Sequence, residues 1–260
     1  MKTIISQALL SLLFTALLVV VAKAIDPIEQ LPQAPDGKIF KLVWQDEFDG
    51  DKLDETKWEV PNNKRRDGWW SPKAVSVNDG HLAISTLKDG DRYLDGCVRT
   101  REKFEHAYGY YVARIKLQEK PGHWSAFWLY NSGVGKVGDQ GRDGTEIDIM
   151  EKPWLDDRIT QNLHWDGYGE HHQHKGTTVA IPGIMEGWHT FALWWQPSEY
   201  VFYVDGRETW RTDAGGVCQV PLYIKLSDEI GEWAGDITKV ELPDRFLVDY
   251  VRVYDLVERK

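Results

Sequence analysis

Hydrophobic and polar residues alternate in short runs along most of this chain, and Gly, Asp and Asn turns separate the runs. Alternation with a period of two predicts β-strands, because successive side chains on a strand point to opposite faces. Helical periodicity is almost absent. We expect strands near residues 81–87, 108–117, 124–130, 191–195, 200–204 and 246–254.

The strand-like runs continue without a linker or repeat from residue 38 to residue 260. One array of this length predicts a single all-β domain, a sandwich of two packed antiparallel sheets. Residues 25–37 contain three prolines and little periodicity, so we expect an extended leader there.

The first 24 residues have the layout of a signal peptide. Lys2 is followed by an apolar run over residues 8–21 and then by small residues up to Ala24. The run is too short to span a membrane comfortably, and no second one follows. We therefore expect a secreted or periplasmic monomer without membrane association once residues 1–24 are removed.

The chain is acidic, with 31 Lys and Arg against 41 Asp and Glu, a net charge of −10. Such a surface repels nucleic acid and anionic membranes, and it fits a neutral polymer partner. It does not exclude a sulfated polymer, because a local positive pocket could form from Arg99, Arg101, Arg142 or Lys225.

Three carboxylates, Glu146, Asp148 and Glu151, interrupt an otherwise apolar, strand-like run at residues 144–152. Glu146 and Asp148 are two residues apart and share a face of the strand, whereas Glu151 falls on the opposite face of a regular strand. One extra residue bulged out near Met150 would bring all three acids to one surface.

Three acids on one surface suit glycoside hydrolysis with retention, in which two carboxyl groups about 5–5.5 Å apart flank the scissile bond. Glu146 is the candidate nucleophile and must be ionised, whereas Glu151 is the candidate acid/base and must hold a proton. Asp148, between them, can tune both by its charge. The alternative is a solvated strand face of an antiparallel sheet.

The wider chain resembles glycoside hydrolase family 16, in particular its laminarinase-like members with a bulged acid motif. The phrases that carry the resemblance lie in the family's order at residues 44–50, 78–84, 108–116, 121–129, 144–152, 188–191, 203–206 and 248–254. The resemblance implies a β-jelly roll with a concave substrate cleft and an endo-acting, retaining mechanism.

The resemblance also implies residues that bind sugar. Trp124, Trp128 and Trp233 match tryptophans that line sugar subsites, and His164 matches a histidine near the cleavage point, with a satisfied core histidine as its alternative. Trp69 and Trp70 either form a more distal sugar subsite or pack in a surface loop. In the first case, Asn62 and Asn63 are candidates to bind sugar hydroxyl groups.

Metal binding has two candidate places. The family often carries a structural calcium, and its ligand positions match Glu47, Gly80 and Asp249 here. The alternative is that Asp249 only pairs with a neighbouring basic residue. His171, His172 and His174 could bind a transition metal, although a solvated loop at the cleft rim is the simpler interpretation. Catalysis itself needs no cofactor.

Cys97 and Cys218 are the two cysteines of the chain. In an exported protein they could form one disulfide, or they could be two buried thiols. Neither arrangement suggests a catalytic role.

Lys225 departs from the family pattern, since many relatives have Asn at this position. A long cation there could meet a sulfate or carboxylate on the polymer, or pair with Asp228 or Glu229.

We expect a β-1,3-glucan or mixed-linkage glucan as substrate, with a marine galactan such as agar, porphyran or carrageenan as the alternative. Two other functions remain possible: a non-hydrolytic glucan-binding protein, and a transglycosylase in which an acceptor sugar replaces water.

Overall fold

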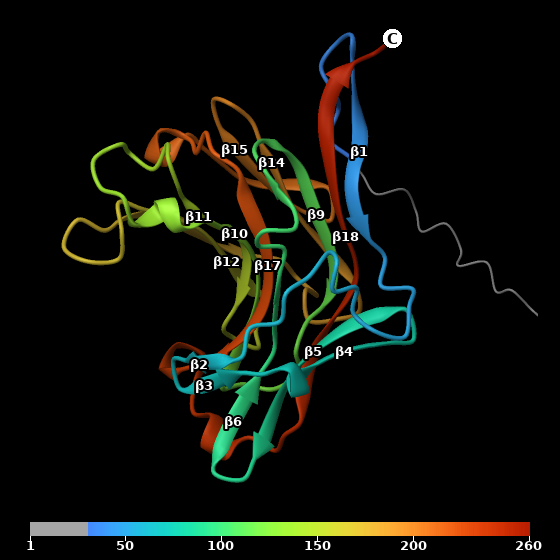
Figure 1. Cartoon of the computed structure of the whole chain (residues 1–260), viewed down its shortest axis with the longest axis vertical. Coiled ribbons are helices and arrows are strands. Elements are labelled where there is room, and N and C mark those ends of the chain that lie inside the picture. The colour runs from blue at the N-terminus through green and yellow to red at the C-terminus, as the bar shows by residue number, and fades with distance from the viewer. Residues whose placement is uncertain (1–30) are drawn as a thin grey trace, which may run out of the picture.

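The computed structural model describes residues 31–260, so the expected signal peptide and the first part of the leader lie outside the described residues. The described chain forms two large sheets packed face to face, as the alternating pattern predicts (Figure 1). All six expected strands are present, and each begins and ends within a few residues of the expected position. No helix among residues 31–260 is long and apolar enough to cross a membrane.

The outer sheet has eleven strands in the order β16-β15-β14-β9-β18-β5-β6-β3-β2, with β1 beside β18 and β4 beside β5. Its strands are antiparallel except for the β3–β6 pair. Their bounds are β1 (Lys38–Asp46), β2 (Asn63–Arg65), β3 (Gly68–Trp70), β4 (Val75–Asn78), β5 (His81–Asp89), β6 (Arg92–Asp95), β9 (Gly109–Lys116), β14 (His189–Trp195), β15 (Tyr200–Val204), β16 (Arg207–Thr212) and β18 (Asp244–Glu258).

The second sheet has seven strands in the order β13-β12-β11-β10-β17-β7, with β8 beside β17. Its bounds are β7 (Cys97–Arg99), β8 (Glu105–His106), β10 (His123–Tyr130), β11 (Glu146–Lys152), β12 (Arg158–Trp165), β13 (Gln173–Ala180) and β17 (Leu222–Ile230). Short 3₁₀ turns connect the strands at Pro72–Ala74, Ser132–Gly135, Ala214–Gly216, Glu232–Ala234 and Ile237–Lys239.

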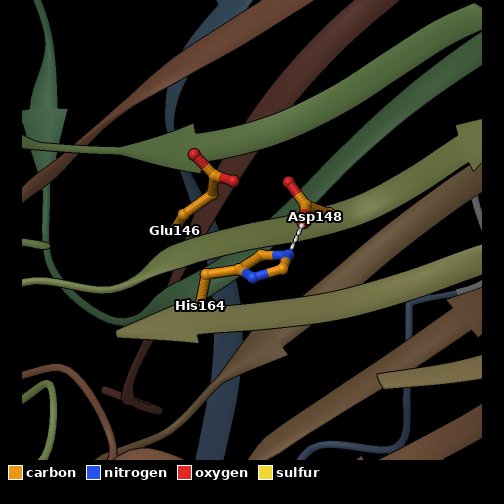
Figure 2. Close-up of side chains that lie close together, drawn as sticks. All are labelled: Glu146, Asp148 and His164. Carbon is orange, nitrogen blue, oxygen red and sulfur yellow. Dashed lines mark ion pairs between the residues drawn. The ribbon is translucent and has the colours of Figure 1, made fainter. Parts of the chain in front are cut away.

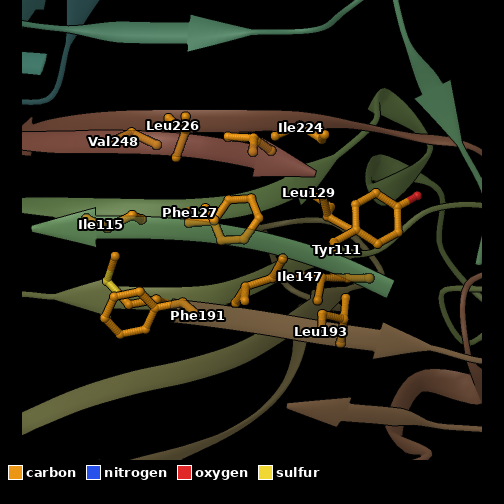
Figure 3. Close-up of a cluster of buried hydrophobic side chains, with 14 of the residues drawn as sticks. Tyr111, Ile115, Phe127, Leu129, Ile147, Phe191, Leu193, Ile224, Leu226 and Val248 are labelled. Carbon is orange, nitrogen blue, oxygen red and sulfur yellow. The ribbon is translucent and has the colours of Figure 1, made fainter. Parts of the chain in front are cut away.

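The hydrophobic core lies between the two sheets and takes every second residue of the central strands (Figure 3). Phe127 and Leu129 of β10 and Ile224 and Leu226 of β17 face Tyr111 of β9 and its neighbours, all without solvent exposure. The residues between them on β10 and β17 point to the other face of the seven-stranded sheet. That face is the candidate substrate surface.

The predicted bulge is present in β11. On β10, Phe127 pairs with Met150 and the next residue, Trp128, pairs with Asp148, so Ile149 has no partner there. On the other side, Asp148 and Glu151 pair with Asn162 and Thr160, so two residues of β11 face one of β12. Both Ile149 and Met150 point into the core. The acids on either side of them are therefore kept on one face.

A buried charged bridge joins the two sheets at one end of the sandwich. The His123 ring on β10 lies 2.7 Å from Asp228 of β17 and 3.1 Å from Asp244 of β18, and it is fully buried. Burial works against the charged ring, but the two carboxylates outweigh it and raise the pKa of His123 to about 10. The imidazolium is thus held by one carboxylate from each sheet.

The two cysteines are free thiols, and both are buried. Of the two alternatives for Cys97 and Cys218, the structure has the unbridged one. Burial raises the pKa of the Cys97 thiol to about 12, so this thiol stays neutral and packs as a small apolar group against Trp70 and Trp128.

We predict that Phe127→Ala lowers the free energy of unfolding by about 3–5 kcal/mol, because it leaves a cavity at the centre of the core. Urea denaturation followed by tryptophan fluorescence measures the change. Val137→Ala, at a position that is 54% exposed, is the control and should stay within about 0.5 kcal/mol of the parent chain. A loss for Phe127→Ala no larger than that of the control would contradict the described core.

Candidate active site

The concave face of the seven-stranded sheet is organised in rows of side chains that cross the strands. One row runs from Arg99 on β7 through Lys225 on β17, Trp128 on β10 and Asp148 on β11 to Asn162 on β12. Neighbouring strands are about 4.8 Å apart, so Lys225 and Asp148 start roughly 10 Å from each other on the sheet. The row therefore places a cation and the acids on the same floor.

The three acids of β11 share this floor. Ile147, Ile149 and Met150 are buried in the core on the opposite face. Glu146 is paired in register with His164 of β12, and Figure 2 shows that its carboxylate and that of Asp148 lie on the same side of their strand. This is the arrangement that the sequence predicted.

Burial raises the pKa of two of the three acids, Glu151 and Asp148. Burial, and then the charge of Asp148, raise the pKa of Glu151 well above its usual range, although a 2.8 Å hydrogen bond donated by Asn162 Nδ2 works in the other direction. Burial, and then the charge of Glu146, likewise raise the pKa of Asp148. Glu146 and Glu151 are both partly exposed to solvent. The raised pKa of Glu151 suits the residue that must donate a proton.

Tyr168 is a functional candidate that sequence reasoning missed. It lies in the loop between β12 and β13, and its hydroxyl donates a 2.5 Å hydrogen bond to Glu146 Oε2. The bond orients the carboxylate of the candidate nucleophile. Nothing in the local sequence signals this contact, since Tyr168 is 22 residues from Glu146 and belongs to a turn rather than a strand.

His164 lies where the family resemblance implies, beside the acids. Its Nε2 is 3.4 Å from Asp148 Oδ2 (Figure 2), and its Nδ1 is 2.9 Å from His172 Nε2. The rings of His164, His172 and His174 are stacked on one another. His171 is exposed at the start of this group. His172 and His174 thus stack on His164, which lies beside the acids, whereas His174, like His171, is exposed to solvent.

A cavity of about 750 Å³ opens beside Glu146, and its lining has five cations against three carboxylates, Glu102, Glu105 and Glu146. Besides Glu146 it is lined by Tyr168 and the aromatic residues Trp70, Trp128, Tyr130 and Tyr223. The cations that line it are Arg65, Arg66, Arg99, Arg101 and Lys225. Of these, sequence analysis singled out Arg99, Arg101 and Lys225; Arg142, its fourth candidate, does not line the cavity.

Lys225 is held in a cage of aromatic rings. Its ammonium nitrogen lies 3.4 Å from the ring centre of Trp128, 4.7 Å from that of Trp70 and 5.5 Å from that of Tyr130. The residue is only 5% exposed, and burial lowers its pKa to about 8. Cation–π attraction to the rings offsets part of the cost of removing the ammonium from water.

The alternative partners of Lys225 are engaged elsewhere. Asp228 contacts His123 and accepts a hydrogen bond from Thr86. Glu229 is nearly buried and lies 2.9 Å from Arg65 and 2.5 Å from Arg66. The expected pairing of Lys225 with Asp228 or Glu229 is therefore not the one that the structure has.

The arginines are held in place by acids outside the cavity. Arg99 makes a two-fold hydrogen bond to Glu59, and Arg101 adds a third contact with the same carboxylate. Arg65 and Arg66 converge on Glu229 at the end of the short strand β2. These pairs fix the guanidinium groups at the edge of the cavity.

Trp124 and Trp233 form an aromatic group farther along the same floor. Their rings are 5.4 Å apart at 79°, and Trp154 meets Trp233 at 5.9 Å. Trp124 is buried and Trp233 is 42% exposed. Trp128, the third of the predicted tryptophans, belongs to the Lys225 cage instead, and its indole donates to Ser227. An exposed ring on the floor can stack on a sugar, so a subsite role for these tryptophans stays a prediction.

The four residues suggested for a distal subsite divide into two sets. Trp70 is buried and lines the cavity beside Lys225. Trp69 instead donates its indole N–H to Asn62 Oδ1 at 2.8 Å, and Asn63 donates to the carbonyl of Lys64. Asn62, Asn63 and Trp69 do not line the cavity. Their contacts are those of a packed surface hairpin.

At the positions suggested for calcium the carboxylate side chains are paired with cations, so calcium binding there, which would rest on main-chain oxygens, stays a prediction. The Glu47 carboxylate is held at 2.8 Å by both Arg252 Nε and Nη2. The Asp249 carboxylate lies 2.8 Å from Arg114 and 3.6 Å from His81. Guanidinium groups already neutralise both carboxylates, and their positive charge would repel Ca²⁺ from these side chains. Gly80 occupies a turn with φ of +74°.

Comparison with known proteins agrees with the fold. Residues 43–256 match the family model described as beta-porphyranase A-D, GH16 domain. The chain is 26% identical to beta-porphyranase B of Zobellia galactanivorans over 88% of this chain and 89% of that protein. It is 27% identical to glucan endo-1,3-beta-glucosidase A1 of Niallia circulans over 86% of this chain but only 39% of that protein.

The structure is also similar to that of the catalytic domain of an endo-1,3-beta-glucanase (laminarinase) from Thermotoga petrophila. The TM-score is 0.72 at 25% identity, and the match covers 86% of this chain and all of that domain. The chain belongs to glycoside hydrolase family 16. It is an endo-glycoside hydrolase that acts on a β-linked polysaccharide.

We predict that Asp148→Asn moves the alkaline limb of the kcat/KM profile to lower pH. The charge of Asp148 raises the pKa of Glu151, so its removal lowers that pKa, and Glu151 loses its proton at a lower pH. Reducing-end release measured between pH 4 and pH 10 checks the shift. Glu151→Gln, which removes the acid itself, should lower kcat/KM about 10²–10⁴-fold. An unchanged alkaline limb in Asp148→Asn would contradict this coupling.

Proposed function

We propose that this protein is an exported, retaining endo-hydrolase of a sulfated β-galactan of the porphyran type. The observation that carries the proposal is the cluster of cations around the cavity beside Glu146, in a chain whose net charge is −10. A neutral glucan gives no reason to bury a lysine at the cleft floor. An ester sulfate, which is ionised at all relevant pH values, does.

Lys225 is the residue best suited to recognise a sulfate group. Removing an ammonium from water is costly, and its pKa of about 8 reflects this cost. A bound anion restores the lost stabilisation, because hydrogen bonds between charged groups contribute about 1.5–3 kcal/mol. The arginines at the rim are already paired with Glu59 and Glu229, so only their remaining N–H groups can face the polymer.

The match to the porphyranase family model and to beta-porphyranase B supports this choice of substrate. Both matches cover most of the chain. The motif of three acids suits glucans and galactans alike, so the charge of the cleft is what distinguishes the two classes.

The mechanism that we propose is double displacement. Ionised Glu146, oriented by the Tyr168 hydroxyl, attacks the anomeric carbon, while Glu151 donates its proton to the departing glycosidic oxygen. The glycosyl–Glu146 ester forms as the glycosidic bond breaks. Glu151, now ionised, then removes a proton from water, which attacks the anomeric carbon and releases Glu146. Asp148 keeps the pKa of Glu151 high throughout.

A β-1,3-glucan is the second candidate substrate. The exposed Trp233 and its aromatic neighbours provide stacking surface that needs no charge on the sugar. The structural similarity to the Thermotoga petrophila laminarinase domain is compatible with it, although porphyranase B is about as similar in structure. This candidate leaves the buried Lys225 without a role in binding.

A panel of polysaccharides tests the substrate class. The purified chain is assayed for new reducing ends on porphyran, desulfated porphyran, agarose, carrageenan, laminarin and lichenan. We expect kcat/KM to be at least about tenfold higher on porphyran than on its desulfated form, because a charge-assisted contact is lost with the sulfate. Equal rates on the two forms, or a preference for laminarin, would reject the sulfated galactan.

We predict that Lys225→Met lowers kcat/KM on the sulfated polymer about 10–100-fold and changes it less than about twofold on a neutral one. Methionine keeps the apolar stem inside the cage and removes the charge. Lys41→Met, at an exposed position of β1 in the other sheet, is the matched control and should leave both rates unchanged. Equal losses on charged and neutral substrates would mean that Lys225 only supports the fold.

The stereochemistry of the first product tests the double displacement. Proton NMR of a fresh digest should show the β-anomer of the new reducing end first, and mutarotation should follow more slowly. Initial accumulation of the α-anomer would show inversion and would exclude Glu146 as a nucleophile.

A further inference from the structure

The two carboxylates and the imidazole in Figure 2 form a compact set of metal-ligating atoms. One atom each from Glu146, Asp148 and His164 lies within 4.8 Å of the other two. The three residues come from the adjacent strands β11 and β12, where Glu146 and His164 are paired directly in register. The backbone of the sheet, and not a mobile loop, holds their spacing.

Asp148 is the buried member of the set. It is only 4% exposed, and its carboxylate points toward His164 Nε2 at 3.4 Å, which is longer than a strong charge-assisted hydrogen bond. A buried carboxylate with so weak a contact has unused capacity to bind a cation. Glu146 is more open than Asp148, and its Oε2 accepts the hydrogen bond of Tyr168, which leaves Oε1 for a cation.

His164 is oriented for coordination by a neighbour. Its Nδ1 is 2.9 Å from His172 Nε2, and the two rings are stacked at an angle of 16°. If Nδ1 donates this hydrogen bond, the lone pair of Nε2 points at Asp148. A ligating histidine in a metal site has the same arrangement, because its second nitrogen donates to a partner that sets tautomer and ring orientation.

From this geometry we propose that Glu146, Asp148 and His164 form a binding site for one divalent late-transition-metal ion such as Zn²⁺. Two carboxylates and one imidazole are three protein ligands, which leaves a fourth position of a tetrahedral ion for water. The imidazole favours Zn²⁺ or Cu²⁺ over Ca²⁺ and Mg²⁺, which prefer oxygen alone. The ligand atoms, which lie within 4.8 Å of one another, would have to move closer to reach the distance of about 2.0–2.2 Å from Zn²⁺.

A metal ion at this point changes the enzyme in a defined way. It occupies the lone pairs of Glu146 that attack the sugar and neutralises the charge of Asp148. Metal and polysaccharide therefore exclude each other, and the ion acts as a reversible inhibitor. The site depends on three residues of the floor and is independent of which polysaccharide the cleft accepts.

Binding without substrate is the direct test. The untagged chain, residues 25–260, is titrated with Zn²⁺ by calorimetry and with Co²⁺ by visible absorption, whose ligand-field bands report coordination. We expect one ion per chain, displaced by a chelator. Glu146→Gln and His164→Asn should each weaken binding more than about tenfold, and His172→Asn about 10–100-fold through loss of orientation.

His171→Asn is the matched control, since His171 is an exposed histidine of the same loop. It should bind the metal as the parent chain does, and thermal unfolding of every variant verifies that it is folded. Absence of saturable binding would overturn the proposal. Binding that survives Glu146→Gln but is lost in His174→Asn would overturn it too, because the ion would then belong to the stacked imidazoles alone.

Discussion

The extra residue in β11 is the constraint on which the active site depends. Strand geometry alone would put Glu151 in the core and Met150 in the cleft, and a buried unpaired carboxylate would cost several kcal/mol. The bulge lets Ile149 and Met150 both face the core, so that Asp148 and Glu151 stay on the concave face. The core accommodates the additional side chain with methionine, the most adaptable of the apolar residues.

Charge is distributed unevenly over this molecule, and the distribution makes chemical sense. Acids dominate the chain as a whole, yet guanidinium and ammonium groups gather around one cavity. Those cations moderate the repulsion among the three catalytic-strand acids: Lys225 and Arg66 both lower the pKa of Asp148, although burial outweighs them. The same groups thus stabilise the acids and attract an anionic polymer.

Much of the fold could be predicted from the sequence, because strand alternation is a local signal. The central strands, the sandwich and the shared face of the acids all follow from the alternation of apolar and polar residues, which one bulged residue interrupts in β11. The short strands β2, β3 and β7 could not be predicted, since their pairing depends on distant partners. Gly68 of β3 shows why: a Cβ there would lie 2.8 Å from Asp95, a contact that only the folded chain reveals.

The candidate site was predictable in its acids and less so in its surroundings. Three residues approach the cleft from turns and hairpin ends: Tyr168, Arg65 and Arg66. In such segments the sequence does not indicate the direction in which a side chain points. The calcium positions were suggested by resemblance alone, and this chain places Arg252 and Arg114 against their carboxylates. Long-range ion pairs of this kind have no periodic signature.

The His123 bridge has a mechanical consequence. The cleft floor and the outer sheet cannot slide past each other at that end without separating a buried imidazolium from a carboxylate, a loss of about 3–5 kcal/mol. The bridge thereby holds the floor of the cleft rigidly against the outer sheet at that end. Any adjustment to the shape of an incoming chain then falls to the turns at its rim, where Tyr168 and Arg66 lie.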